Sequence, residues 1–198
     1  MKHITFFVFI FLSSFSLAQT LHKSIEALKT ERNPIIDGVI EPNLWLNAPK
    51  AKNWTQVEPK NGEIERSNQK SEVQFMYDDR ALYISAMFYD TSPDSIYTEL
   101  GLRDEENKNC DWFGVWISPY NDAQNEFMFG VTAAGVQQDS RSTIDGSDKN
   151  WDAVWNSAVQ IHEKGWSAEI EIPYSALRIP NINIQEWGIN VGREIRRT

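Results

Sequence analysis

The sequence predicts an all-β protein, an antiparallel β-sandwich with short helical turns. Short segments of alternating apolar and polar residues recur at regular spacing, turn sequences separate them, and no long segment has the helical period. The chain has 198 residues, of which 41% are hydrophobic and 24% charged, which suits one medium-sized domain. Two facing antiparallel sheets are the architecture that buries such alternating strands.

The N-terminal residues 1–18 have the pattern of a signal peptide. Lys2 and His3 precede the apolar run 4–15, and Ser16-Leu17-Ala18 supplies the small residues of a cleavage site. The apolar run is shorter than the roughly 20 residues that span a bilayer, so we expect cleavage and not a membrane anchor. The sequence therefore predicts an exported protein.

Charge and cysteine content exclude two classes of protein. Removing residues 1–18 removes one lysine and no acidic residue, so the net charge falls from −9 to −10. Such an acidic protein repels phosphate backbones, and we expect no nucleic-acid partner. Cys110 is the only cysteine and cannot form an internal disulfide, so the core must supply the stability.

The predicted domain spans residues 33–198, after a polar, loosely attached lead-in at 19–32. It opens with "NPIIDGVIEPNLW", in which Pro34 begins a short strand, Asp37-Gly38 turns, and Trp45 ends a helical or looped stretch. A series of predicted hairpins follows between Trp45 and the C-terminus.

Three hairpins and a last strand account for most of the domain. "SEVQFMYDDRALYISAMFYD" turns at Asp78-Asp79-Arg80. The second hairpin joins 111–118 to 126–132, and the third joins 157–162 to 166–172. The final "WGINVGREIRR" predicts one more strand, whose arginines we expect to face water.

The second hairpin has an unusual outer face. Alternation places Phe113, Val115 and Ile117 toward the core and Trp112, Gly114 and Trp116 away from it. Since both apolar sets must face one core, an allowed register pairs Gly114 with Gly130, Trp116 with Met128, and Trp112 with Thr132.

This register predicts a notch without side chains between two indoles, which lie about 13 Å apart along the strand. Indoles stack on the flat C–H patches of pyranose rings, so Trp112 and Trp116 are candidate sugar-stacking residues. The alternative is that both tryptophans pack beneath residues 91–109 or against a partner.

The order of the motifs resembles a known family. "PIIDG" followed by a tryptophan, the first two hairpins, "WDAVWNSAV", "GWSAEIEIPYSALRIP" and "WGINVGREIRR" occur in the order of the carbohydrate-binding module family 9-like domain. That domain opens a group of exported Bacteroidota proteins, in which a long region thought to be an outer-membrane β-barrel follows it. The resemblance covers nearly all of 33–198.

The resemblance implies a family 9 carbohydrate-binding/DOMON-like sandwich and a polysaccharide or oligosaccharide ligand. It also implies a role in carbohydrate catabolism at the cell surface, with the protein in the periplasm, at the outer-membrane surface or extracellular. No C-terminal β-barrel region follows in this chain, so we expect the domain to be truncated at its C-terminus or to be a short relative.

The family's sugar contacts do not carry over residue by residue. The first stacking tryptophan of family 9 aligns near Lys108, its acidic hydrogen-bonding residue near Gly114, and its arginine near Met128. The second stacking tryptophan would lie beyond Thr198. The candidate carbohydrate-binding residues are therefore this chain's own: Trp112 and Trp116 for stacking, Asp111, Arg103 and Glu126 for hydroxyl contacts, and Trp151 and Trp155 as an extension of the surface.

Two of these assignments have alternatives. Trp151 and Trp155 are four residues apart and equally suit a role in the core. Oxygen-bearing side chains alternate in the segment that precedes Trp155: Asp145, Asp148, Asn150 and Asp152. Such a pattern suits a structural calcium ion, which the resemblance also implies. An EF-hand is excluded because Ala153 replaces its glycine, and an ordinary polar loop is the alternative.

Glu169 and Glu171 raise the possibility of glycoside hydrolysis, because they alternate along one strand and paired carboxylates flank the bond that glycosidases cleave. Ser167 shares their face, which predicts a solvated surface that leaves the pKa of both glutamates unraised. We therefore expect a non-catalytic domain. The remaining alternatives are a docking domain of an outer-membrane barrel protein that binds no sugar and, last, a glycoside hydrolase.

Overall fold

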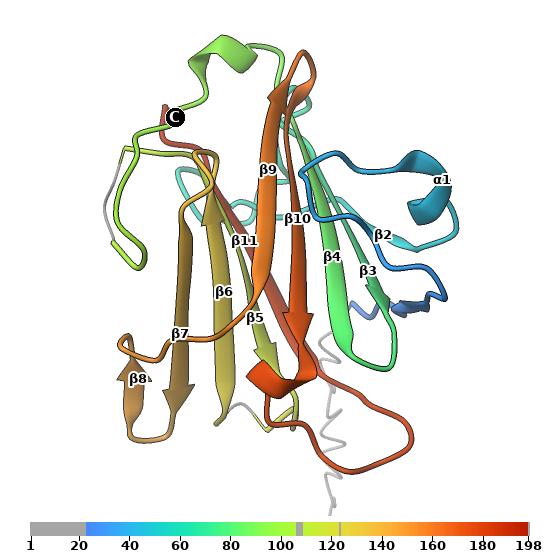
Figure 1. Ribbon diagram of the computed structural model, residues 1–198. Helices are drawn as coiled ribbons and strands as arrows, with labels where there is room; N and C mark the ends of the chain where they lie inside the picture. The colour runs from blue at the N-terminus through green and yellow to red at the C-terminus, as the bar shows by residue number, and fades with distance from the viewer. Residues whose placement is uncertain (1–22, 106–108, 123, 198) are drawn as a thin grey trace, which may run out of the picture.

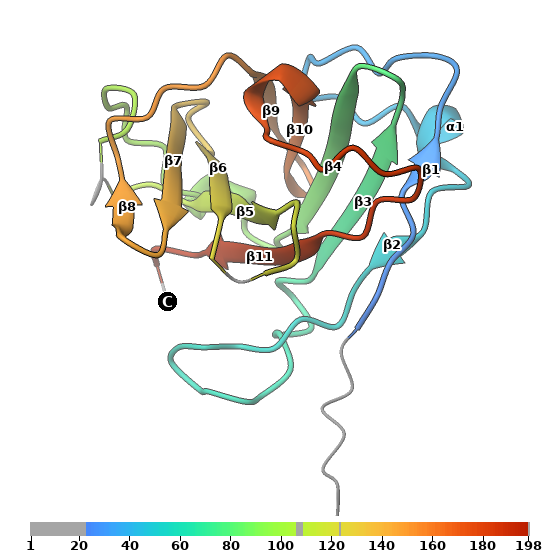
Figure 2. The same cartoon turned by 90° about the horizontal axis from the view of Figure 1, so that it is seen from below.

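The computed structural model describes residues 23–105, 109–122 and 124–197. The predicted signal peptide and Lys108 lie outside these residues. The described chain forms two sheets that face each other as two layers, seen side-on in Figure 1 and from below in Figure 2. The predicted antiparallel sandwich is thus confirmed, with one short parallel pair as an exception.

The strands follow in two groups. The first sheet contains, from edge to edge, β1 (Leu28–Lys29), β3 (Ser71–Tyr77), β4 (Ala81–Tyr89), β10 (Gly165–Pro173) and β9 (Asn156–His162), and β2 (Lys50–Ala51) also pairs with β3. The second sheet contains β11 (Gly188–Glu194), β5 (Trp112–Ser118), β6 (Glu126–Thr132), β7 (Gln137–Thr143) and β8 (Gly146–Asp148).

Among the residues that the structure describes, helical structure is confined to single turns: α1 (Pro42–Trp45) and the 3₁₀ turns η1 (Pro93–Ser95) and η2 (Tyr174–Ala176). Within the described parts of the chain, no helix has the length and apolar character needed to cross a membrane. The predicted hairpins all form, as β3–β4, β5–β6 and β9–β10, and the last strand is β11.

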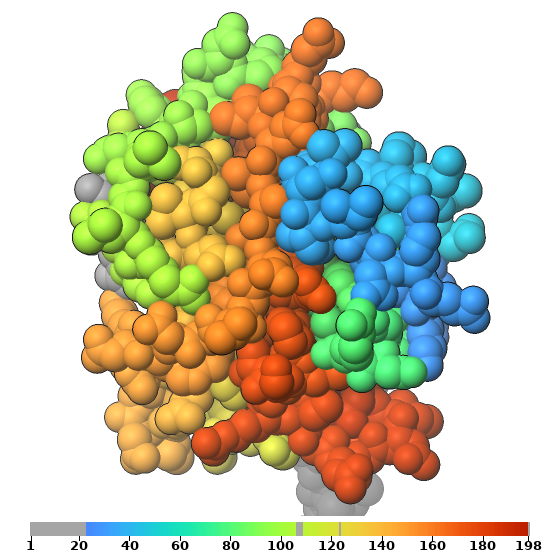
Figure 3. Space-filling model, viewed as in Figure 1, coloured from blue at the N-terminus to red at the C-terminus, as the bar shows by residue number. Residues whose placement is uncertain are grey.

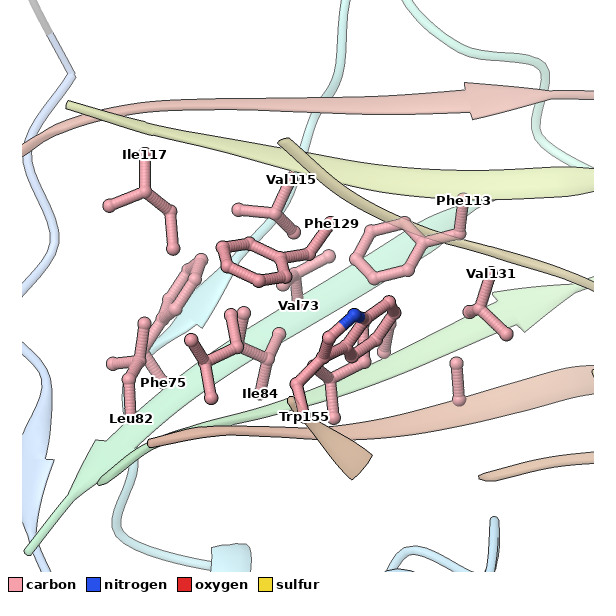
Figure 4. Packing of buried hydrophobic residues seen from close by; sticks show 14 of the residues in the cluster. Val73, Phe75, Leu82, Ile84, Phe113, Val115, Ile117, Phe129, Val131 and Trp155 are labelled. Carbon is pink, nitrogen blue, oxygen red and sulfur yellow. The ribbon is translucent and has the colours of Figure 1, made fainter. Parts of the chain in front are cut away.

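The core lies between the inner faces of the two sheets. Figure 4 shows Val73, Ile84 and neighbours from the first sheet opposite Phe113, Val115 and Phe129 from the second. Rings contact across this layer, with the centroids of Phe88 and Phe113 4.9 Å apart. These fully buried aromatic and branched side chains supply most of the favourable free energy of folding, since each contributes roughly 1.5–3 kcal/mol.

The N-terminal part of the domain differs from the sequence-based expectation. Leu28 pairs with Met76 in the parallel β1–β3 contact, and the amide of Thr30 donates to the carbonyl of Tyr77 over 2.8 Å. The sheet therefore begins before residue 33, and the described part of the lead-in forms an edge strand that pairs with β3. A two-residue strand at the edge of a sheet is held by backbone hydrogen bonds and tolerates polar neighbours in the sequence. The composition of this segment therefore did not indicate β1.

A second difference lies on the outer face of the first sheet, which the N-terminal segment covers. Trp45 packs there against Met76, Ala81 and Tyr83 in a small cluster of its own. The Nε2 of Gln74 donates to the carbonyl of Trp45 over 2.8 Å. As a result β3, β4 and β10 are buried on both faces, not on one.

Candidate functional site

The β5–β6 hairpin has the register that the sequence predicts. Gly114 lies opposite Gly130, Trp116 opposite Met128, and Trp112 opposite Thr132. On its other side β5 pairs with β11, which places Gly192 beside Gly114. Three glycines from three adjacent strands therefore form a track across the outer face of the second sheet.

The predicted open notch between the indoles is wrong, because the indole of Trp112 fills it. A Cβ atom added at Gly114 would lie 2.0 Å from Cη2 of Trp112, and one at Gly130 would lie 2.6 Å from its Cζ2. The ring of Trp112 thus lies across both glycines. The centroids of Trp112 and Trp116 are 5.6 Å apart with an interplanar angle of 63°. The side chains lean together, and the spacing of about 13 Å holds for the backbone positions alone.

We call the half-buried side chains Trp112, Trp116, Glu126 and Met128 the tryptophan face. Burial raises the pKa of the Glu126 carboxyl above its ordinary value. The loop before β5 reaches only the border of this face among the described residues, where the Nε2 of Gln138, paired with Gly130, donates to the carbonyl of Glu105 over 2.6 Å. Both indoles remain partly exposed.

Asp111 does not belong to this face, contrary to the sequence-based prediction. Its side chain is buried, and its Oδ1 accepts a hydrogen bond from the backbone amide of Arg196. Burial raises its pKa. A carboxyl in this position cannot reach a sugar hydroxyl. It instead holds the C-terminal segment against the start of β5.

The C-terminal arginines join the two sheets and do not simply face water. The guanidinium of Arg193 donates to the carbonyl of Gln69 over 2.9 Å, and its burial lowers its pKa to about 10. Arg197 forms an ion pair with the fully buried carboxylate of Asp90.

Arg103, a predicted contact for sugar hydroxyls, is held by the protein's own acceptors. Its guanidinium donates to the carboxylate of Asp139, to Oε1 of Gln137 over 2.5 Å, and to Oδ1 of Asp152 over 3.2 Å. Asp139 is buried and also accepts a 2.8 Å hydrogen bond from the indole of Trp155. Arg103 therefore fastens its loop to β7, and Asp139 and Gln137 are partners that the polar sequence of β7 did not indicate.

Trp151 and Trp155 pack into the core, as the alternative to the sugar-binding interpretation states. The ring of Trp155, which is 5% exposed, lies 5.4 Å from that of Phe129. The ring of Trp151 lies 5.3 Å from that of Phe127. Figure 4 shows Trp155 closing the space between the two layers.

Beside these residues lies an open cleft of about 750 Å³ at the edge of the sandwich, between β9 and β7. We call it the edge cleft. Its polar side chains are Arg103, Gln137, Asn156, Ser157 and Glu171, and Trp155, Val136, Pro34 and Ile36 supply apolar surface. Figure 3 looks onto this side, where segment 151–165 in orange runs between the N-terminal segment in blue and the loop before β5 in yellow-green.

The predicted calcium residues do not form a matching set. Oδ1 of Asp148 accepts the backbone amide of Asn150, and Asp152 faces the guanidinium of Arg103. Within the described ranges, no group of three or more histidine, cysteine, aspartate or glutamate side chains could hold a metal ion. A cation beside Asp152 would have to compete with Arg103, so calcium stays a prediction of the sequence.

The prediction that Glu169 and Glu171 both lie on a solvated surface is wrong for Glu169. It is 1% exposed, and its Oε2 accepts the backbone amides of Asp37 and Gly38 over 3.3 and 3.1 Å. Burial, partly opposed by these two hydrogen bonds, raises the pKa of Glu169 to about 7. The Asp37-Gly38 turn is pressed onto β9, because a Cβ at Gly38 would lie 2.6 Å from the carbonyl carbon of Val159.

The predicted site residues are thus distributed over four places. The tryptophan face holds Trp112, Trp116 and Glu126, and the edge cleft region holds Arg103, Trp151, Trp155 and Asp152. Asp111 lies at the C-terminal arginines, and Asp148 lies in β8.

Comparison with known proteins decides the family. Residues 36–193 match the family described as carbohydrate family 9 binding domain-like. The chain belongs to this family. The match spans the sandwich from the Asp37-Gly38 turn to Arg193, so that both the tryptophan face and the edge cleft are parts of the family 9-like domain.

Solved structures share the fold of this family 9-like domain at low sequence identity. A protein from Bacteroides uniformis, which carries the provisional description of a carbohydrate-binding protein, has a TM-score of 0.65 at 11% identity and covers 88% of this chain and 84% of its own. A carbohydrate binding module family 9 from Caldicellulosiruptor kristjanssonii in complex with cellotriose has a TM-score of 0.56 at 15% identity, with 84% and 75% covered. Its complex with glucose gives 0.58 at 14%, with 84% and 76% covered. A search of curated proteins found no match.

The tryptophan face can be compared with the sugar contacts that the sequence-based resemblance implies. The resemblance expects an acidic residue near Gly114 and an arginine near Met128, and both positions lie on the outer face of the β5–β6 hairpin. The indole of Trp112 occupies the space above Gly114. An aromatic surface therefore stands where the resemblance expects charged hydrogen-bonding groups.

Proposed function

We propose that this chain is an exported, non-catalytic domain that binds polysaccharide or oligosaccharide through the tryptophan face. The observation that carries the proposal is the pair of partly exposed indoles, Trp112 and Trp116, supported on glycines of three adjacent strands. The cellotriose and glucose complexes of the Caldicellulosiruptor kristjanssonii module support the class of ligand.

The physical basis is stacking on a rigid surface. The Trp112 ring lies over Gly114 and Gly130, so its position is set before a ligand arrives and binding orders few rotamers. The C–H patch of a pyranose ring can then be buried against indole. Glu126, on the same face, is an acceptor for sugar hydroxyls when it is ionised.

The arrangement of the two glutamates supports a binding domain over a glycoside hydrolase. Glu169 has the raised pKa that a general acid needs, but its carboxyl is sealed beneath the Asp37-Gly38 turn and cannot reach a glycosidic oxygen. Glu171 is then left without its partner carboxylate.

Affinity electrophoresis in gels that contain soluble neutral polysaccharides tests the proposal. We expect the protein to be retarded by at least one polysaccharide, and we expect Trp112→Ala and Trp116→Ala to abolish the retardation. Trp187→Ala is a matched control, because it removes another half-buried indole that packs against the core and not on this face. Retardation that survives both substitutions would refute the tryptophan face as the site.

The same experiment separates the two alternative functions. A folded protein that no polysaccharide retards would favour a docking domain. Reducing sugar released by the purified protein and lost in Glu169→Gln would favour a hydrolase. Export has its own test, because cleavage after Ala18 leaves Gln19 as the first residue of the secreted chain, which mass spectrometry detects.

A further inference from the structure

We propose that the edge cleft is a second binding site, for a neutral oligosaccharide, separate from the tryptophan face. The ligand class rests on the proposed function, while the location rests on the cleft itself. Nothing in the sequence-based site prediction joined Glu171, Asn156 and Gln137 into one site, because they come from three different strands.

The cleft has a fixed polar wall. The Nε2 of Gln137 donates to Oγ of Ser157 over 3.0 Å, and its Oε1 accepts from Arg103 over 2.5 Å. The Nδ2 of Asn156 donates to Oε2 of Glu171 over 2.8 Å. These side chains are therefore held in place before a ligand binds, which reduces the entropic cost of binding.

Hydrogen-bonding capacity remains unused on the polar side chains that line the cleft. Oε1 of Glu171 and Oδ1 of Asn156 accept no hydrogen bond from the residues that the structure describes. Both are acceptors, and the Ser157 hydroxyl can donate while its oxygen accepts from Gln137. Two free acceptors and a donor suit adjacent hydroxyl groups of a sugar ring.

The charges favour a neutral ligand over an acidic one. The guanidinium of Arg103 is balanced by the carboxylates of Asp139 and Asp152. By contrast, Glu171 forms no ion pair within the described chain. A uronic acid carboxylate would therefore meet a net negative wall, and like charges cost binding free energy.

The volume and the apolar lining of the edge cleft also suit an oligosaccharide. A volume of about 750 Å³ lies within the range of roughly 300–1,000 Å³ for small-ligand sites. The apolar part of the lining comes from Val136, Trp155, Pro34 and Ile36. A pyranose has both hydroxyls and apolar C–H patches to offer such a surface.

The two sites are separated by the edge of the second sheet. Arg103 contacts β7 from the side of the cleft, and two residues later the carbonyl of Glu105 contacts Gln138 on the outer face. The loop thus wraps around the edge of β7 between the two sites. We therefore expect the sites to bind independently.

Titration of ¹⁵N-labelled protein with neutral trisaccharides, followed by NMR, tests the inference. The probes are cellotriose, xylotriose, mannotriose and maltotriose, and tri-galacturonic acid is the acidic counterpart. We expect at least one neutral trisaccharide to shift the amide signals of Val136 and Ser157, and the acidic one to shift neither. Glu171→Ala should weaken this binding about tenfold, since it removes a charged hydrogen-bond acceptor.

Glu163→Ala, an exposed change on the β9–β10 turn, is the matched control and should leave the affinity unchanged. If Glu171→Ala does not fold, Asn156→Ala provides the second variant, because Asn156 is exposed.

Failure of the inference and failure of the proposed function are distinguishable. Trisaccharides that shift only signals of Gly114 and Gly130 would overturn the cleft site and keep the tryptophan face. Shifts confined to Val136 and Ser157 would keep the cleft site and remove the tryptophan face. No shift at either place at about 10 mM ligand would overturn both.

Discussion

The indole of Trp112 lies directly over Gly114, so that a single added methyl group at residue 114 would lie 2.0 Å from its Cη2 atom. This contact makes the glycine a functional position although it carries no side chain. The indole can lie across the strands only while Gly114 and Gly130 both lack a Cβ atom. The tryptophan face therefore depends on two residues that no ligand would touch.

Gly114→Ala should displace Trp112 from the sheet. We expect a loss of roughly 1–3 kcal/mol in the free energy of unfolding, typical of overpacking, together with loss of polysaccharide retardation. Urea unfolding measures the first effect. Circular dichroism follows the coupling between Trp112 and Trp116, whose centroids are 5.6 Å apart. Gly188→Ala on β11 is the control, because its Cβ would meet the movable Asn121 side chain at 3.1 Å. An unchanged dichroism spectrum in Gly114→Ala would contradict the packing.

Glu169 should make the stability depend on pH. Its pKa rises from an ordinary value near 4.5 to about 7 on folding, so the folded state holds the proton more tightly. The stabilising contribution is complete below pH 4.5 and is lost as the pH rises through 7, on the order of 3 kcal/mol in total. Glu169→Gln stays neutral and removes this dependence.

We therefore expect urea unfolding to show Glu169→Gln as more stable than the unmodified protein at pH 8, with the difference shrinking at pH 5. The exposed variant Glu163→Gln controls for the substitution itself. Equal pH profiles for Glu169→Gln and the unmodified protein would show that the carboxyl is ionised in the folded state.

Removing only Arg197 from the ion pair between Arg197 and Asp90 should destabilise the folded protein. The Asp90 side chain is fully buried, and Arg197→Ala would leave its carboxylate without its ion-pair partner. We expect a loss of about 3 kcal/mol in the free energy of unfolding. The exposed Arg178→Ala should change it by less than about 0.5 kcal/mol. Adding Asp90→Asn to Arg197→Ala should recover part of the loss, because the buried charge at residue 90 is then removed. A double variant no more stable than Arg197→Ala would argue against this origin.

The calcium prediction for residues 145–152 has a direct test. Asp152 already faces Arg103 over 3.2 Å, so a cation would displace an existing contact. We therefore expect millimolar calcium, or its removal by a chelator, to leave the Tm unchanged. A Tm that rises with calcium in the unmodified protein but not in Asp148→Asn would instead support the sequence-based prediction, since a ligand that binds only the folded state stabilises it.

The strands that alternate regularly could be predicted from the sequence, and those that do not could not. In β5 and β6 the apolar residues fall on every second position, and the requirement of a shared core left few registers to choose from. In β7 the inward positions are Gln137, Asp139 and Arg141, so the alternation gives no signal. Asp139 is accommodated in the core by Arg103 and Trp155, which are distant in the sequence.

The sequence by itself determined the class of fold, the order of the hairpins and the face on which Trp112 and Trp116 stand, because these follow from the period of two along each strand. Tertiary structure alone decided that the Trp112 indole covers Gly114, that Asp111 and Glu169 are buried, and that Glu171 and Gln137 line one cleft. Each of these depends on which distant segment packs over a residue, and the spacing of residues along one strand contains no information about what covers it.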